Sequence, residues 1–201
     1  MSQDEYILVE KPAIEQLKKL NWKYVEGISL SPDETDERKS FKHVILKKRL
    51  INSIKRINPW IDQDNLNKIV RELINISNLN LIEANKKVYE YLTKYLSVEQ
   101  DLGKGQKNQT VKVVDFDNID NNEFLVTNQF KVAGINQNIV PDIILFVNGI
   151  PLAVIECKSP FITNPMEAGI KQILRYCNNR KPEENEGAEK LFFYNQILVS
   201  T

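Results

Sequence analysis

Two acidic residues and a lysine interrupt the most apolar part of the chain, residues 140–160 (VPDIILFVNGIPLAVIECKSP). Asp142 opens one apolar run, and Glu156 and Lys158 break the next. Charged side chains inside apolar strands are costly unless they are paired or bind a metal. Because side chains alternate between the two faces of a strand, Glu156 and Lys158 share one face and Cys157 points to the other. This pattern indicates a chemical site.

The two acids meet only if the strands on either side of Asn148-Gly149 pair with an odd offset. A strict two-residue hairpin turn would leave Asp142 and Glu156 on opposite faces of the sheet. An odd-numbered loop, or a bulge in one strand, would bring them together. We expect the odd-offset register, which a three-residue loop over 148–150 would provide by placing Asp142 opposite Glu156.

Two adjacent carboxylates repel each other unless a cation joins them. Mg²⁺ prefers oxygen ligands and keeps several waters, so Asp142, Glu156, a backbone carbonyl and waters would suit it. Such an ion could activate a water molecule and offset the charge that develops on a phosphate. Lys158 could orient that water or stabilise the transition state, so the set predicts phosphodiester hydrolysis. The alternative is a surface salt bridge on an edge hairpin, since exposed ion pairs are common.

The elements that must position these residues change in character near residue 100. Apolar residues recur at helical spacing over residues 11–96. The predicted helices are 12–20, 38–57, 66–73 and 81–95. The polar stretch over 97–110, which holds two glycines, predicts a loop.

The second half reads mostly as strands. β-branched and aromatic residues are enriched there, and the predicted strands are 111–116, 123–132, 141–147, 152–158 and 191–199. A helix interrupts them from Asn164 to about residue 178, with Asn164 as N-cap, Pro165 first and Glu167 as the reciprocal capping partner. The expected fold is therefore α/β (α+β), with a mixed sheet of about five strands, a crossover helix and the first helix covering the sheet.

Composition excludes several classes of protein. With 27 Lys and Arg against 27 Asp and Glu in 201 residues, the chain has no overall basic coat for nucleic acid. No apolar run approaches the roughly 18–20 residues of a membrane span, and the acidic start is unlike a signal peptide. The two cysteines, Cys157 and Cys177, make no disulfide framework, so we expect reduced thiols in a cytoplasmic protein without membrane contact.

A basic stretch lies within the predicted helix over 38–57. Residues 36–56 hold eight Lys or Arg against two Asp or Glu. The stretch has two interpretations, a stripe that tracks DNA phosphates and, favoured here, the solvated outer face of an amphipathic helix. The candidate DNA-binding residues are Lys42, Lys48, Arg49, Lys55 and Arg56.

The spacing Pro141-Asp142 to Glu156-Cys157-Lys158 resembles the PD-(D/E)xK nuclease motif. Beyond it, five strings resemble the N-terminal nuclease domain of type I restriction enzyme R subunits (HsdR). They are VEKPAIEQLKKLNWKY (9–24), NQFKV (128–132), PDIILFVNGIPLAVIECKSP (141–160), QILRY (172–176) and FFYNQILVST (192–201). The resemblance covers most of the chain, more weakly over 33–110, and implies a PD-(D/E)xK restriction-endonuclease-like core.

The resemblance implies roles for individual residues. Asp142 and Glu156 would bind the metal with help from the backbone carbonyl of Cys157, and Lys158 would be the catalytic lysine. The family more often has a larger apolar residue at the position of Cys157, which faces away from the metal, so the departure concerns packing alone.

Two helices would support the site. Gln172 and Tyr176 match the family's QxxxY element and lie four residues apart, so one helix face carries both. An acid on the first helix often supports such sites, and the candidates are Glu10 and Glu15, of which Glu10 is favoured.

By this resemblance the chain is a single endonuclease domain, 1–201, at the N-terminus of a longer R subunit. It would contain a helical insertion over 33–100 and a catalytic sheet over 111–201. The end of the chain directly after an apolar run also favours a fragment.

The activity expected from the resemblance is that of a type I site-specific deoxyribonuclease. It would depend on Mg²⁺, with Mn²⁺ as a substitute, and cut double-stranded DNA without sequence preference after ATP-driven translocation by motor domains. Methyltransferase and specificity subunits would be its partners. The chain contains no GxxxxGK[ST] motif, so ATP is expected to bind elsewhere in the full subunit.

Two other functions are compatible with this fold. The chain could be a non-enzymatic DNA-binding or docking module whose helical part, about 33–100, contacts partner subunits. It could also be a solitary repair or resolvase-type nuclease of the same superfamily. The intact Asp142, Glu156 and Lys158 favour an enzyme over the first, and the abrupt end of the chain disfavours the second.

Overall fold

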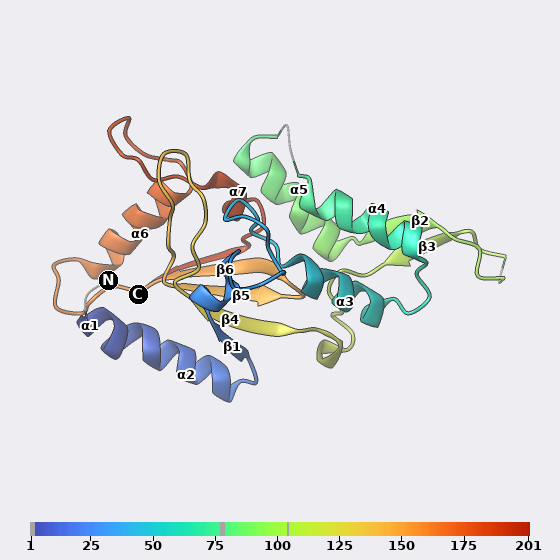
Figure 1. The fold of residues 1–201 in the computed structure, drawn as a ribbon, viewed down its shortest axis with the longest axis horizontal. Coiled ribbons are helices and arrows are strands. Elements are labelled where there is room, and N and C mark those ends of the chain that lie inside the picture. Colours follow the sequence, from blue (N-terminus) through green and yellow to red (C-terminus); the bar gives the residue numbers. More distant parts are fainter. Residues whose placement is uncertain (1–2, 77–78, 104) are drawn as a thin grey trace.

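A five-stranded mixed sheet forms the centre of the computed structural model, which describes residues 3–76, 79–103 and 105–201 (Figure 1). The strands are β1 (Lys23–Glu26), β4 (Phe124–Asn128), β5 (Ile143–Val147), β6 (Ile150–Glu156) and β7 (Ile197–Ser200). They lie in the order β1-β4-β5-β6-β7. β1 runs parallel to β4 and β6 to β7, while the other neighbours are antiparallel. The expected mixed fold with about five strands is confirmed.

Helices cover both faces of this sheet (Figure 1). They are, in chain order, α1 (Gln3–Glu5), the π-helical turn η1 (Tyr6–Glu10), α2 (Lys11–Lys19), α6 (Pro165–Tyr176) and α7 (Glu189–Phe192). On one face, Ile14 of α2 packs against Val126 and Cys157, as expected for the first helix. On the other face, Ile173 of α6 belongs to the main core together with Val154 of β6. None of the described helices is both long and apolar enough to cross a membrane.

The remaining helices lie at one end of the sheet (Figure 1). They are α3 (Lys47–Ile57), α4 (Gln63–Ile74) and α5 (Leu81–Thr93), followed by a hairpin of β2 (Leu96–Glu99) and β3 (Asn108–Val111). Two short 3₁₀ turns, η2 (Gly27–Leu30) and η3 (Ile119–Asn121), complete the structure. The backbone N–H of Leu46 donates to the carbonyl of Gly149 at 2.9 Å, so the β5–β6 turn rests against the start of α3.

The predicted helix over 38–57 is wrong in its first part, because α3 begins only at Lys47. The reason is a tertiary anchor. The guanidinium of Arg38 is buried over the ring of Phe130, 4.1 Å from its centroid, and donates to the carbonyl of Lys131 at 2.6 Å. These contacts hold the segment before α3 in an irregular path, since tertiary contacts override a weak local preference.

Two predictions near residue 110 are also wrong. The stretch over 97–110 is not a loop throughout but contains the β2–β3 hairpin, in which Leu96 and Val98 are buried between exposed polar neighbours. The predicted strand over 111–116 is not formed beyond Val111, where β3 ends. Oδ1 of Asp115 instead accepts hydrogen bonds from the backbone N–H groups of Asp117 and Asn118, which makes a turn. Such turns compete with strand pairing.

The strands at 123–132 and 191–199 are shorter than predicted. β4 ends at Asn128 because the next residue, Gln129, adopts a left-handed conformation with φ of 50°. In the predicted strand over 191–199, the buried residues Leu191 and Phe192 form the end of α7, and β7 begins only at Ile197.

Candidate active site

A β-bulge in β6 brings the two acids together. Val147 pairs with Ile150 across a two-residue turn, so the odd offset does not come from a three-residue loop. The register then shifts within the hairpin and leaves one extra residue in β6. The following pairs are Phe146 with Pro151, Leu145 with Ala153, Ile144 with Val154 and Ile143 with Ile155. The same register, continued by one residue, sets Asp142 opposite Glu156, which is the odd offset that the sequence required.

Asp142, Glu156 and Lys158 form one connected group at the open end of this hairpin. Both acids are buried, with 5% of Asp142 and 0% of Glu156 exposed. The backbone N–H of Cys157 donates to Oδ2 of Asp142 at 2.8 Å. Nζ of Lys158 donates to Oε1 of Glu156 at 2.8 Å and to the carbonyl of Cys157 at 2.9 Å. The lysine therefore lies beside two of the three oxygen groups that the resemblance assigns to a metal.

The acids perturb each other's ionisation. Burial and then the charge of Asp142 raise the pKa of Glu156 to about 8, although Lys158 opposes the shift. Burial also raises the pKa of Asp142, against the opposing effects of the Cys157 N–H and of Lys158. Burial lowers the pKa of Lys158, but the hydrogen bond to Glu156 and the charge of Glu156 have a larger opposite effect. The net result is a raised pKa for Lys158. Two acids that resist ionisation together are a place where a cation is favoured.

One oxygen of the group has no partner on the described chain. Oε2 of Glu156 is buried and receives no hydrogen bond, so the charged form of Glu156 would be costly here without a cation. The described residues hold no group of three or more His, Cys, Asp and Glu side chains able to bind a metal. A divalent ion at this place would therefore rely on Asp142, Glu156, the Cys157 carbonyl and waters, a donor set that suits Mg²⁺.

Glu10 lies next to this group, whereas Glu15 does not. Glu10 is fully buried, and its Oε1 accepts from Asn128 Nδ2 at 2.8 Å. Nε2 of Gln129 donates both to Oε2 of Glu10 at 3.1 Å and to Oδ1 of Asp142 at 3.2 Å. Burial raises the pKa of Glu10, and these amide donors oppose the shift. Glu15 is exposed and pairs with its neighbour Lys18 at 2.8 Å.

Sequence reasoning missed Glu5, Asn128 and Gln129. Oε1 of Glu5 lies 3.4 Å from Nζ of Lys158. Glu5 and Glu10 are five residues apart, and the π-helical turn between them, a feature often found at functional sites, is not visible in an apolar pattern. The Asn-Gln pair at the end of β4 was the available signal, because polar residues at a strand end beside the acids can reach them.

The helix α6 brings the second predicted pair towards the acids. Nε2 of Gln172 donates to the hydroxyl of Tyr176 at 2.7 Å. Burial raises the pKa of Tyr176, and the charge of Glu156 adds to that shift, so the phenol lies within electrostatic reach of the acids. The helix can approach because position 169 is glycine, where a Cβ would come within 2.2 Å of Oγ of Ser200.

The predicted capping box at the start of α6 is wrong. Asn164 occupies the N-cap position with φ of 53°, and its side chain makes no capping hydrogen bond. Glu167 pairs instead with Lys171 one turn later, at 2.7 Å. Pro165 still starts the helix, since its fixed φ suits a first helical residue.

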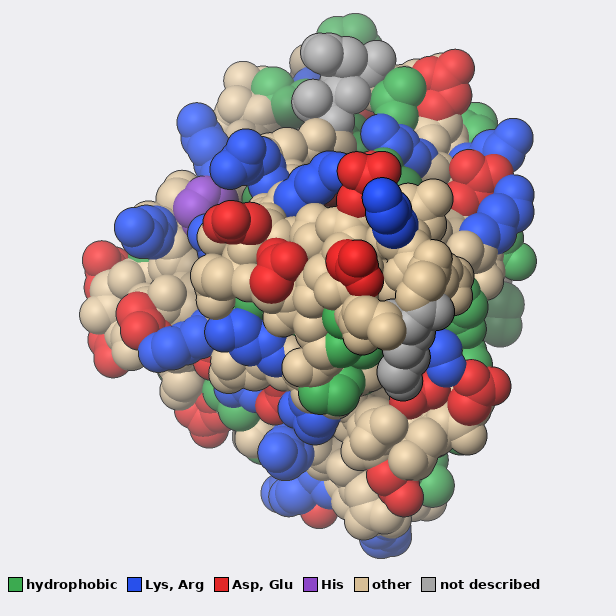
Figure 2. All heavy atoms as spheres, turned by 90° about the vertical axis from the view of Figure 1, so that its right-hand side faces the viewer, with side chains coloured by type: hydrophobic (Ala, Val, Ile, Leu, Met, Phe, Trp, Pro, Cys, Tyr) green, Lys and Arg blue, Asp and Glu red, His purple; other side chains and the backbone are tan. Residues whose placement is uncertain are grey.

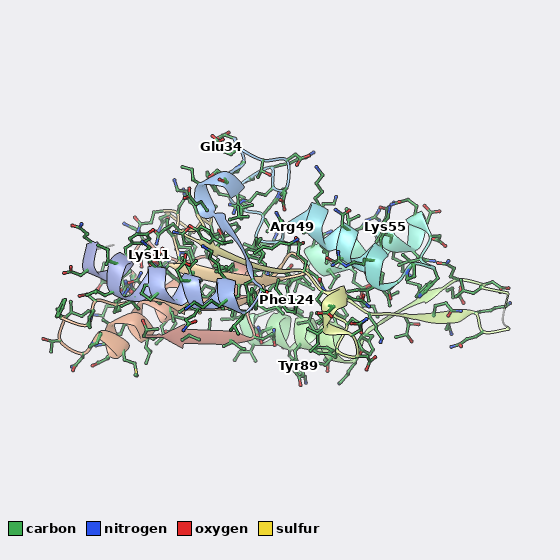
Figure 3. All side chains as sticks on the ribbon, turned by 90° about the horizontal axis from the view of Figure 1, so that it is seen from below. Lys11, Glu34, Arg49, Lys55, Tyr89 and Phe124 are labelled. Atoms are coloured by element: carbon green, nitrogen blue, oxygen red, sulfur yellow. The ribbon has the colours of Figure 1, made fainter. Side chains whose placement is uncertain are left out.

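The candidate DNA-binding residues do not form one free stripe. Lys42 precedes α3 and is not helical. Arg49 is held by Glu37 at 2.8 Å and Glu123 at 2.6 Å. Figure 3 shows Arg49 and Lys55 along α3, far from Lys11 on the N-terminal helices. The remaining contacts are Lys48 with Asp36 at 2.6 Å, Lys55 with Gln63 at 3.2 Å and Arg56 with the Asn121 carbonyl at 2.8 Å.

Known proteins resemble the chain over nearly its whole length. The model of the family described as "Type I restriction enzyme R protein N terminus" matches residues 2–201. A protein of Methanocaldococcus jannaschii named "Putative type I restriction enzyme MjaIXP endonuclease subunit" is 37% identical over 98% of this chain and 18% of its own length. A protein of Haemophilus influenzae named "Type I restriction enzyme HindI endonuclease subunit" is 29% identical over 95% of this chain and 18% of its own length. The chain thus spans less than a fifth of these relatives.

Proposed function

The chain belongs to the family of type I restriction enzyme R protein N-terminal domains, and from that premise we propose that it is an Mg²⁺-dependent endonuclease domain that hydrolyses phosphodiester bonds of double-stranded DNA. One observation carries the proposal. Asp142, Glu156 and Lys158 adjoin one another, and the buried Oε2 of Glu156 has no donor on the described chain. The relatives' names, which are those of endonuclease subunits, support the same reaction class.

Each residue of the site has its own task in this reaction. Asp142, Glu156 and the carbonyl of Cys157 would hold the metal, which when bound would supply an activated water and offset charge on the phosphate. Lys158 places its ammonium where negative charge develops. Gln129, which bridges Glu10 and Asp142, acts as a positioning residue for the metal-binding carboxylate. Gln172 orients Tyr176 on the neighbouring helix α6.

The reaction takes place within a larger assembly. The chain acts at the N-terminus of an R subunit, whose motor domains use ATP to translocate DNA, and together with methyltransferase and specificity subunits. Cutting is non-specific in sequence, because recognition belongs to another subunit. The relatives' length, of which this chain spans 18%, supports such a context.

Metal binding by the 201-residue chain is the first test. Calorimetric titration with Mg²⁺ or Mn²⁺ should detect binding that Glu156→Ala weakens by at least about tenfold, since it removes a direct ligand. Glu15→Ala is the matched control, because Glu15 is exposed and lies outside the site. Equal binding by the wild type and Glu156→Ala would show that the acids do not form the metal site.

Cleavage is tested in the assembled enzyme. Lys158→Ala should abolish DNA cutting while ATP-driven translocation continues. Lys171→Ala, which removes an exposed lysine of α6, should leave both activities unchanged. Cutting at the wild-type rate by Lys158→Ala would refute the catalytic assignment. Absence of cutting by the intact enzyme would favour a docking or DNA-binding module instead.

A further inference from the structure

A second candidate site lies among the helices. A cavity of about 430 Å³ opens between the segment before α3, the helix α4 and the region of α7. Four basic side chains line it, and the lining contains no Asp or Glu. They are His43, Lys47, Arg71 and Lys190. Figure 2 looks onto this end of the molecule, where Lys and Arg side chains and one acidic side chain lie beside the single histidine.

The cavity is separate from the group around Glu156. Its residues His43 and Lys47 flank Leu46, which is hydrogen-bonded to Gly149 in the turn before β6. Glu156 ends the same strand, six residues beyond Ile150. At about 3.3 Å per residue, the two ends are roughly 20 Å apart. A phosphate in the cavity is therefore not the one that the proposed nuclease would cut.

Donors predominate among the polar side chains of the cavity, which also include the amide of Asn75. Nδ1 of His43 accepts the backbone N–H of Lys39 at 3.3 Å, so the neutral ring carries its proton on Nε2. Oδ1 of Asn67 already accepts from Gln63 at 3.1 Å, which leaves the amide N–H groups to donate. Within the described residues, the other three basic side chains, Lys47, Arg71 and Lys190, enter no ion pair. The cavity therefore favours a ligand that carries negative charge and many acceptors.

Apart from the amides of Asn67 and Asn75, the rest of the lining is apolar. Val70 and Tyr194 are buried, and Ile51 and Ile74 are half-buried beside them. The hydroxyl of Tyr194 donates to the carbonyl of Leu73 at 2.9 Å, so its polar end is already satisfied. A volume of about 430 Å³ lies within the range of small-molecule sites.

We propose that this cavity binds a nucleotide, with its phosphate among His43, Lys47, Arg71 and Lys190 and its base against the apolar lining. A duplex is a convex rod whose backbone contacts protruding cations and does not fill a hollow. A single nucleotide, either free or at an unpaired position of a strand, is of a size that such a hollow can hold. This binding is additional to the proposed nuclease and does not depend on it.

The test is calorimetric titration of the 201-residue chain in EDTA, which removes any metal from the acidic site. The probes are deoxyadenosine monophosphate, inorganic phosphate and an unpaired ten-nucleotide strand. Arg71→Gln and Lys190→Gln should each weaken nucleotide binding at least about fivefold, because each removes a charged donor. Lys68→Gln is the matched control, since it removes an exposed charge from the same helix, α4, outside the cavity lining.

The outcomes separate the sources of the ligand. Binding of the mononucleotide with this variant pattern supports a free nucleotide. If only the ten-nucleotide strand binds, and Arg71→Gln and Lys190→Gln weaken that binding, the ligand is a nucleotide held within a single DNA strand. Phosphate binding as tight as the mononucleotide would overturn the role of the apolar lining. Absence of binding by all probes, or affinities unaffected by Arg71→Gln and Lys190→Gln, would overturn the site.

Discussion

Glu156 links the charge of the site to the stability of the fold. Its carboxyl has a pKa of about 8 because it is buried and lies near Asp142. Without a metal, the folded chain therefore keeps this proton at neutral pH. A divalent ion would replace the proton, so metal affinity is expected to rise as the pH approaches 8.

The raised pKa predicts that the metal-free chain loses stability as the pH rises. An ordinary glutamate releases its proton near pH 4.5, whereas the folded chain holds that of Glu156 to about pH 8. Between these values the folded state binds more protons than the unfolded state, so increasing pH lowers the free energy of unfolding. The loss amounts to at most about 1.4 kcal/mol per pH unit. Glu156→Gln removes the titrating group and should be more stable than the wild type at pH 8.

Urea unfolding in EDTA at pH 5, 6.5 and 8 measures this difference. The gap in the free energy of unfolding between Glu156→Gln and the wild type should widen with pH. Glu15→Gln, on an exposed helix surface, should follow the wild type apart from a small loss of its pair with Lys18. Curves that stay parallel for Glu156→Gln and the wild type would contradict the raised pKa.

At the scale of elements, the sequence predicted those parts that bury a regular face. The helices α2, α4 and α5 were recognised because apolar residues recur along one side, whereas α6 was recognised from its start, where Pro165 is the first helical residue. The irregular path of the segment before α3 was not recognised, because it depends on the contact of Arg38 with Phe130, which lies 92 residues further along the sequence. Local periodicity carries no information about such a contact.

The candidate site shows the same division. Asp142, Glu156 and Lys158 were visible because charge is rare inside apolar strands. Their mutual position required an odd offset, but the bulge that provides it has no residue signature. Gln129 was not singled out, because its role depends on a left-handed backbone that aims its amide between two acids.

The β5–β6 turn gives a prediction about how this hairpin meets α3. Gly149 has φ of 79°, and a Cβ there would lie 2.5 Å from the carbonyl oxygen of Leu46 and 2.9 Å from the N of Leu50. Gly149→Ala should therefore lower the free energy of unfolding by about 3 kcal/mol, since it combines backbone strain with a clash against α3.

A second glycine separates the effect of the steric clash from that of backbone strain. Gly105 has nearly the same φ, 78°, but a Cβ there would meet nothing within 4 Å. Gly105→Ala should cost only about 1 kcal/mol, the backbone part alone. Thermal and urea unfolding of both variants measure the difference. Equal destabilisation by the two substitutions would mean that the turn does not pack on α3 as described.

At the scale of the whole molecule, the helical end and the sheet share one buried core. Leu50 of α3 and Val88 of α5 belong to the same cluster as Phe146 and Ile150 of the hairpin. Polar contacts cross the same boundary, since the hydroxyl of Tyr194 donates to the carbonyl of Leu73 at 2.9 Å. If the helical end were separated from the sheet, it would lose much of the buried apolar core that keeps it folded.

This sharing predicts that the segment over 33–100 and the sheet unfold together. Trp22 lies at the sheet, with its ring 5.1 Å from that of Phe124, and Trp60 follows α3. In the single-tryptophan variants Trp60→Phe and Trp22→Phe, fluorescence should report the same urea midpoint, and circular dichroism of each variant should coincide with it. A chain of this length can populate intermediates, so coincidence is informative. A lower midpoint at Trp60 than at Trp22 would instead identify the helical segment as a separate folding unit, despite the continuous core.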